Sequence, residues 1–433
     1  MSGLIDAAGT TTPVSVTWAS KNTWRSGSAG ATATSLNGNL LKGYLDDGTS
    51  TTLPNGATAT LSGIPYLTYE AYVYYASDQA GAGENLSNGY RSVGINGTNY
   101  TWNGTATVVG TANWTGRNWT DDDTLTEGLH YLKATGQKAG TLAVTPNAGA
   151  SPTARASIAG IQLKDTYTGT LAYWDVNGTS AGAGGATPSG NWTDPNWSAS
   201  ADGSGATSTW TAGVTAVFAA GTDATDTYSV ALGSPQTADA VWLKQGSLTL
   251  TGSALTLGTT GLLRADGTST LTLASDLNAT ALTTTGAVTL SGLSTVTGTL
   301  ALSSGTLTLS GDLTSTIAGA GFGGILSGGG TLLKQGSGTL KLTAINTFAG
   351  TMTIAAGTLE AGIATTSGDA SSLGNGTTTL NVNAGGTLLF STASRAAGYH
   401  RGAVNVRGGT ITFNSDDNTL ASGNTLTSTP PPA

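Results

Sequence analysis

The sequence contains no cysteine and has few histidines, charged residues and aromatic residues. Its 433 residues include two His, 9% charged residues and 6% aromatic residues. Without Cys, the chain has no disulfide, no thiolate nucleophile and no Cys-based zinc or iron–sulfur site. Its two histidines, His130 and His400, are too few for a three-His metal site. No apolar run reaches the roughly 18 residues of a membrane-spanning helix, so we expect no transmembrane segment.

Basic residues are also scarce. The chain has 24 acidic and 16 basic residues and a formal net charge of −8 at pH 7. Because no cluster of Lys and Arg is present, we expect no nucleic-acid partner. The residues after Met1 show neither the basic nor the apolar stretch of a signal peptide, so we interpret the chain as a mature or truncated segment.

The abundant residue types predict an all-β protein. Gly, with 65 residues, and Thr, Ser, Ala and Leu dominate, whereas helix-favouring Glu, Lys, Gln and Arg are scarce. Thr and Val favour strands, and Gly favours turns. Composition divides the chain into residues 1–167, a Trp- and Asp-rich junction at 168–245, a repeat region at 246–429 and a Pro-rich tail at 430–433.

Residues 1–167 predict an antiparallel β-sandwich with a jelly-roll-like arrangement. Within Tyr66–Tyr75, side chains alternate with a period of two, which indicates a strand with one buried face. The pair Asn96-Gly97 predicts a hairpin because both residues tolerate positive φ. Roughly eight short strands separated by such turns are typical of a sandwich.

Residues 246–429 contain a recurring pentapeptide in which Gly precedes alternating hydroxyl and Leu residues. It occurs as Gly246–Leu250, Gly305–Leu309 and Gly338–Thr339-Leu340-Lys341-Leu342 among others. A five-residue strand buries two or three apolar side chains at about 1.5–3 kcal/mol each, against an ordering cost of about 1–2 kcal/mol per residue. Such a strand is stable only between stacked neighbours, and the irregular spacing favours a solenoid over a propeller. We therefore predict a parallel β-helix with Leu inside and Thr outside.

The junction contains four closely spaced tryptophans: Trp174, Trp192, Trp197 and Trp210. The first coil of a solenoid has no neighbour on one side, so its strand edges and apolar side chains need covering. We therefore expect the junction to cap the β-helix.

One segment of the repeat region resembles a known family. Residues 329–362 are similar to the autotransporter-associated β-strand repeat, with Phe348 in the usual Tyr place and Ala349 in the usual Thr place. The residues in register with that repeat are Lys334, Gly336, Gly338, Asn346, Thr347, Gly350, Gly357 and Gly362. The resemblance implies a right-handed parallel β-helix in a secreted or surface-displayed passenger protein.

The first region contains the strongest candidates for ligand binding. Trp102, Trp114 and Trp119, with Tyr100, lie in a stretch rich in Gly, Asn and Thr. Aromatic faces flanked by amides and carboxylates suit a sugar-binding cleft, so we predict a carbohydrate or cell-surface glycan as partner. The alternative is that these rings fill the sandwich core.

The acidic triplet Asp121, Asp122 and Asp123 is the densest charge in the chain. Clustered carboxylates can bind Ca²⁺, the one cofactor that we consider, although the EF-hand spacing is missing. Asp122 and Asp123, together with His400, are also candidates for catalysis. The alternative interpretation of the triplet is a solvated loop whose side chains cap turns, and we favour it.

The outward Thr residues of the predicted β-helix suggest one more function. A flat array of Thr could order water or bind ice. Alternatively, Thr is simply a soluble β-branched residue suited to such a face. Taken alone, the sequence favours the second interpretation.

The sequence therefore predicts a monomeric protein, secreted or at the outer cell surface, with a β-helix spacer and a glycan-binding sandwich. One alternative is a hydrolase or lyase acting on polysaccharide or ester, with its site in the sandwich or at the inter-domain cleft. Scarce charge argues against catalysis in the repeat, where Arg395, His400, Arg401 and Arg407 form the only basic cluster. A second alternative is a purely structural adhesin stalk.

Overall fold

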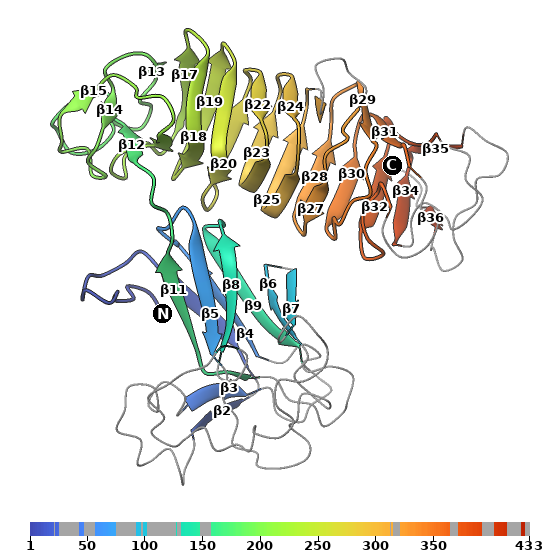
Figure 1. Cartoon of the computed structure of the whole chain (residues 1–433), viewed down its shortest axis with the longest axis horizontal. Coiled ribbons are helices and arrows are strands. Elements are labelled where there is room, and N and C mark those ends of the chain that lie inside the picture. The colour runs from blue at the N-terminus through green and yellow to red at the C-terminus, as the bar shows by residue number, and fades with distance from the viewer. Residues whose placement is uncertain are drawn as a thin grey trace. The chain divides into compact units, whose positions relative to one another are not determined.

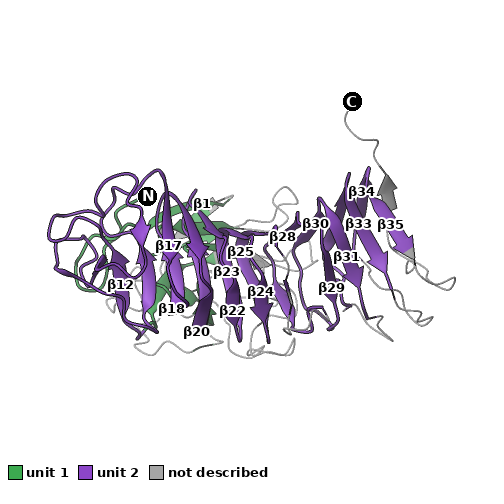
Figure 2. Ribbon diagram, turned by 90° about the horizontal axis from the view of Figure 1, so that it is seen from above, with its two compact units in different colours: residues 1–167 green, residues 168–433 purple. Residues whose placement is uncertain are grey.

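A computed structural model describes most of the chain. The described residues are 1–20, 22–25, 43–46, 57–74, 92–96, 98–101, 127, 131–147, 157–311, 313–314, 321–363, 371–391, 402–413 and 426–428. Every regular element in these ranges is a β-strand, so the predicted all-β class is confirmed. This part of the chain holds no helix capable of spanning a membrane. The chain divides into two compact units, Met1–Tyr167 and Thr168–Ala433 (Figure 2).

The described residues of the first unit form three antiparallel sheets. The largest has the order β1 (Ser15–Ala19), β4 (Thr58–Ser62), β9 (Thr141–Asn147), β6 (Ser92–Ile95) and β7 (Thr98–Thr101). The second has the order β11 (Gly160–Asp165), β5 (Tyr69–Tyr74) and β8 (Tyr131–Gln137). The third has the order β10 (Ser157–Ile158), β3 (Gly43–Asp46) and β2 (Asn22–Arg25).

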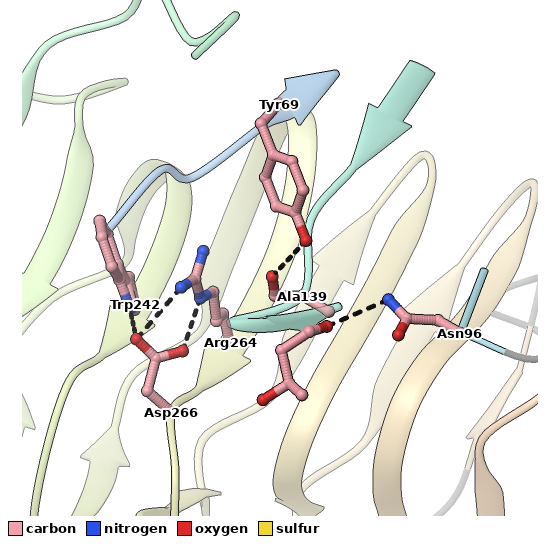
Figure 3. A network of polar contacts seen from close by, with 7 residues as sticks. Tyr69, Asn96, Ala139, Trp242, Arg264 and Asp266 are labelled. Atoms are coloured by element: carbon pink, nitrogen blue, oxygen red, sulfur yellow. Dashed lines mark hydrogen bonds and ion pairs between the residues drawn. The ribbon is translucent and has the colours of Figure 1, made fainter. Parts of the chain in front are cut away.

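The first two of these sheets share one hydrophobic core. Leu61 and Val144 from the first sheet belong to the same buried cluster as Ala71 and Val73 from the second. The hydroxyl of the fully buried Tyr69 donates a hydrogen bond of 2.9 Å to the Ala139 carbonyl (Figure 3), which satisfies its polar end. The predicted antiparallel sheets are therefore present, whereas a jelly-roll-like sandwich stays a prediction.

The hairpin predicted at Asn96 is confirmed. Strands β6 and β7 pair antiparallel, with Ile95 opposite Thr98. Asn96 has a φ of 50°, the left-handed conformation that this residue type tolerates. Its side-chain oxygen also accepts a hydrogen bond of 2.8 Å from the Ala143 amide, which ties the turn to β9.

The second unit is a parallel β-solenoid of about 8 turns over residues 216–412. In Figure 1 its strands lie side by side in a ladder from β17 towards β35. The first strands are β12 (Leu171–Trp174), β13 (Gly190–Asn191), β14 (Trp197–Ser198), β15 (Thr207–Ser208), β16 (Thr215–Phe218), β17 (Thr227–Leu232), β18 (Gln236–Leu243), β19 (Ser247–Gly252) and β20 (Leu255–Ala265). The middle strands are β21 (Thr270–Leu273), β22 (Leu277–Ala279), β23 (Leu282–Leu290), β24 (Ser294–Val296), β25 (Leu300–Leu309), β26 (Leu313–Thr314), β27 (Leu326–Gly328) and β28 (Thr331–Lys334). The last strands are β29 (Thr339–Leu342), β30 (Thr351–Ile354), β31 (Gly357–Ala361), β32 (Thr379–Asn383), β33 (Gly386–Phe390), β34 (Val404–Arg407), β35 (Thr410–Phe413) and β36 (Leu426–Ser428).

One row of strands runs through the solenoid from β17 to β36 by way of β19, β21, β23, β25, β28, β30, β32 and β34. The parallel register aligns one inward column down this row: Tyr228, Leu248, Leu271, Val288, Leu307, Leu332, Met352, Leu380 and Val404. From Tyr228 to Val404, every one of these side chains is buried in a single core. The intervening residues, such as Thr249 and Thr272, lie on the opposite face. The predicted arrangement with Leu inside and Thr outside is therefore confirmed.

The segment 329–362 forms more than one coil, and its polar motif residues hold the corners. Lys334 is buried in register with Leu309 and Ile354, and its ammonium donates a hydrogen bond to the Gly336 carbonyl at the turn. Asn346 is fully buried and bridges two neighbouring coils. Its side-chain oxygen accepts from the Leu326 amide at 2.8 Å, and its amide donates to the Ser372 carbonyl at 2.6 Å.

Stacked glycines allow adjacent coils to approach closely at one turn. Gly286 and Gly305 occupy the same register position, with φ values of 77° and 76°. A Cβ on Gly305 would overlap the carbonyl oxygen of Gly286, which belongs to the backbone of the coil below. Two features therefore require glycine at position 305: the positive φ of its backbone and its close approach to the neighbouring coil.

We expect Gly305→Ala to destabilise the solenoid clearly more than Gly267→Ala. Gly267 also has a positive φ, of 57°, but a Cβ there meets nothing within 4 Å, so its cost is about 1–2 kcal/mol for the conformation alone. Gly305→Ala adds a clash with the backbone. Urea unfolding followed by circular dichroism measures both, and equal losses would contradict the close-approach argument.

Candidate functional site

Most of the predicted site residues lie outside the described residues. This holds for Trp102, Trp114, Trp119, Asp121, Asp122, Asp123 and His400. Tyr100 lies in β7, opposite Val93 of β6. The glycan site, the calcium site and the catalytic candidates therefore stay predictions. Within the described ranges, no three or more His, Asp or Glu side chains gather in a group that could hold a metal ion.

The four tryptophans of the junction form one aromatic cluster with Phe218. The ring centroids of Trp197 lie 5.2 Å from Trp174, 4.9 Å from Trp192 and 4.5 Å from Trp210. The Trp174 indole donates to the Pro188 carbonyl at 2.6 Å, which satisfies its polar end inside the cluster. All but Trp210 are buried, and they are part of the core that continues down the solenoid. The enclosed rings of Trp174, Trp192 and Trp197 offer packing area and no free face for a sugar.

Aspartates of the junction accept hydrogen bonds from their own loops. Asp223 accepts bonds of 2.7 Å from the amides of Ala183 and Gly185. Asp202 accepts from the Ser200 hydroxyl at 2.6 Å and from the Ser204 amide at 3.0 Å. These carboxylates therefore fix loop conformation, as turn-forming Asp residues commonly do.

The bonds to Asp202 lower the pKa of its carboxyl from 3.8 to about 2. The Ser200 hydroxyl has the largest effect, followed by the amide and hydroxyl of Ser204. All three donors favour the ionised form. Because its pKa is lowered, this carboxylate stabilises the loop at pH values above its ordinary pKa of 3.8. The stabilisation is lost as pH falls towards the lowered pKa of about 2.

We expect Asp202→Asn to lower the thermal midpoint at pH 7 and to have a much smaller effect near pH 2. As pH falls towards the lowered pKa of about 2, protonation of the wild-type carboxyl removes most of its contribution. Differential scanning calorimetry of both proteins across this range measures the difference between their midpoints. A difference that is independent of pH would show that the charge of Asp202 does not stabilise the loop.

A polar network connects adjacent coils at the end of β18 and β20. Trp242 and Arg264 are paired in the parallel register, and the guanidinium carbon lies 4.4 Å from the centroid of the indole ring. Asp266 accepts bonds from Arg264 Nε at 2.7 Å, from Arg264 Nη2 at 3.2 Å and from Trp242 Nε1 at 2.8 Å (Figure 3). The carboxylate thus holds both the guanidinium and the indole, and the stacking adds a cation–π interaction.

Lys244 lies at the margin of this network. Its ammonium is 6.0 Å from the centroid of the Trp242 ring. Burial lowers the pKa of Lys244, the carboxylate of Asp266 opposes this shift, and the charge of Arg264 adds to it. Because Asp266 already engages Arg264 through two nitrogens, this group of charged residues fits a structural clamp better than a substrate site.

We expect Asp266→Asn to destabilise the protein by about 3 kcal/mol, because it leaves a buried guanidinium without its charge partner. Glu360→Gln is the matched control. It removes a carboxylate that lies 2.7 Å from the ammonium of Lys341, and this lysine is partly exposed to solvent. Such a pair contributes up to about 1 kcal/mol. Urea unfolding followed by tryptophan fluorescence compares them, and equal losses would contradict the clamp.

The outward face of the long strand row carries two columns of hydroxyl groups. We define the threonine face as the twelve outward positions of β19, β21, β23, β25, β28 and β30 that the register aligns with Thr270 and Thr272 of β21. Nine of the twelve are Thr249, Thr270, Thr272, Thr289, Thr306, Thr308, Thr331, Thr351 and Thr353, and the other three are Ser247, Ala287 and Leu333. All twelve are partly exposed, and none is charged.

The register is unbroken along the threonine face. The register shift between β23 and β25 lies at Thr284 and Thr285, before the residues of the face begin at Ala287. Among the hydroxyls of the face, in the part of the chain that the structure describes, only that of Thr353 is used in a side-chain hydrogen bond. It accepts from the Asn381 amide at 3.3 Å. The other hydroxyls are therefore available to water or to a ligand.

Comparison with known proteins identifies the repeat. Residues 332–361 match the family model described as the passenger-associated transport repeat, and they span β28 to β31. Comparisons with curated proteins and with solved structures found no match. The repeat and the β-solenoid fit an autotransporter passenger-type repeat protein, as the resemblance of residues 329–362 predicted.

Proposed function

We propose that the protein is a secreted or surface-displayed passenger in which the solenoid is a stiff spacer and the first unit binds carbohydrate. The observation that supports the spacer is the continuous parallel register from β17 to β36, with one hydrophobic core beneath it. In a solenoid each coil contacts only its neighbours, so length is added without a new fold. An elongated module of this kind can hold a binding unit away from a surface.

The carbohydrate-binding part of the proposal rests on the first unit. Trp102, Trp114, Trp119 and Tyr100 supply aromatic faces close together in the sequence, and Asp121–Asp123 supply groups for sugar hydroxyls or for Ca²⁺. The aromatic cluster of the second unit is enclosed in its core, which leaves the first unit as the better location for a sugar site.

The second candidate function is hydrolysis or elimination on a polysaccharide or an ester. Asp122 and Asp123 are its candidate acid and base groups, and His400 is the candidate in the repeat region. The scarcity of charge in the repeat and the structural use of Arg264 and Asp266 favour the binding function over this one. A purely structural adhesin stalk is the third candidate, and it predicts neither binding nor turnover.

We expect Trp114→Ala and Trp119→Ala to lose most binding on a glycan array, because each removes a stacking ring. Trp18→Ala is the matched control, since Trp18 is exposed on β1 outside the candidate group. The array is run with Ca²⁺ and with a chelator, which tests the acidic triplet at the same time. Equal retention by all three variants would contradict the proposed site.

A panel of hydrolase and lyase substrates distinguishes the second candidate. Turnover by the wild-type protein that is abolished in Asp122→Asn would replace the binding function with catalysis. No response in either assay would favour the stalk.

A further inference from the structure

We propose that the threonine face binds ice. The inference concerns the second unit alone and does not depend on carbohydrate binding by the first. It starts from the register of the solenoid, because the register converts a composition rich in Thr into a two-dimensional array. The sequence alone does not place Thr272 beside Thr249 and Thr289, whereas the strand pairing does.

The dimensions of the array follow from strand geometry. Neighbouring strands lie about 4.7–4.9 Å apart, and residues two apart on one strand are separated by about 6.6 Å. Hydroxyls at these positions form a nearly rectangular net, as in the group Thr270, Thr272, Thr306 and Thr308. Thr289 lies between Thr272 and Thr308 in one column, and Ala287 lies between Thr270 and Thr306 in the other. The interstrand repeat is close to the spacing of oxygen atoms along the shorter axis of the prism face of ice, and the repeat along the strand is somewhat shorter than the spacing along the longer axis. Waters bound along each column of hydroxyls would therefore sit near lattice positions.

The chemistry of the face suits an uncharged lattice of water. Each Thr presents a hydroxyl, which can donate and accept a hydrogen bond, beside an apolar methyl group. Charged side chains would hold hydration shells incompatible with a lattice, and the twelve positions contain none. Apart from Thr353, the hydroxyls make no competing side-chain hydrogen bond within the described residues.

The face is also preorganised. Thr is stiff at χ1, and a pleated sheet restricts it further, so little conformational entropy is lost when the array engages a solid surface. The sheet below is held by the buried Leu column on its inner side. Each hydroxyl contributes little by itself, so binding requires many of them in register, and six successive coils provide this.

The other sheet of the solenoid shows what the threonine face avoids. Thr339, Thr358, Thr387 and Thr410 form one outward column in β29, β31, β33 and β35. The neighbouring column holds Lys341, Glu360, Leu389 and Thr412, so a charged pair and a leucine occupy three of the four positions where the second row of hydroxyls would be needed. Thr387 is therefore a matched control position, outward and on a strand, but outside any double array.

The test measures thermal hysteresis, the gap between the melting and freezing points of a single ice crystal, and the shape of that crystal. We expect the 433-residue chain to produce a gap and faceted crystals. The double variant Thr289→Tyr/Thr308→Tyr should reduce the gap to that of buffer, because two bulky rings at the centre of the array prevent contact with a flat surface. Thr387→Tyr should behave like the wild type.

Tyr has a high strand propensity, and circular dichroism with thermal melts establishes that all variants are folded. Ice growth in the wild-type protein that matches growth in buffer would overturn the proposal. So would an equal loss of hysteresis in the Thr387→Tyr protein. If the face instead mediates self-association, the wild type sediments as a dimer and the double variant as a monomer without any effect on ice, which also overturns it. Binding to insoluble polysaccharide without an effect on ice does the same.

Discussion

The stacking of one coil on the next is the interaction on which the second unit depends. A single coil buries too few aliphatic side chains to offset its own conformational entropy. The parallel register places Leu307 against Val288 below and Leu332 above, so each aliphatic side chain is covered by its neighbours on both sides. The same register supplies the backbone hydrogen bonds. Stability therefore resides in contacts between coils, and any residue that changes the distance between coils affects the whole stack.

The stacking of coils restricts the choice of residue at the turns much more than on the flat faces of the sheets. At the turns, close approach between coils admits only Gly, as at Gly305 above Gly286. On the flat faces, nothing in the stack selects the outward side chain except strand propensity and solubility. The long row nevertheless keeps Thr at nine of the twelve positions of the threonine face over six coils, whereas the other sheet places Lys341 and Glu360 at such positions. The difference between the two sheets cannot come from folding requirements alone, because both have the same requirement.

Sequence periodicity was sufficient to predict the solenoid, its inward Leu and its outward Thr, because these depend only on alternation within five residues. Contacts between coils could not be predicted in the same way. Arg264 pairs with Trp242 across 22 positions, and other coils differ in length, so no fixed period brings these two residues together. The buried position of Lys334 was hidden for another reason. A charged residue in a strand is normally exposed, and only the nearby Gly336 carbonyl at the turn makes its burial acceptable.

The aspartates show how far composition can mislead about chemistry. In the junction, Asp202 and Asp223 bind amides and hydroxyls of their own loops, so a high count of carboxylates there reflects turn formation. A turn can use one carboxylate in this way because each needs its own N–H donors a few residues away. Three consecutive carboxylates at Asp121–Asp123 would compete for the donors of one turn while repelling one another, and a divalent cation would relieve that repulsion. Even with this argument, Ca²⁺ binding by the triplet stays a prediction beside turn capping, the interpretation that the sequence favours.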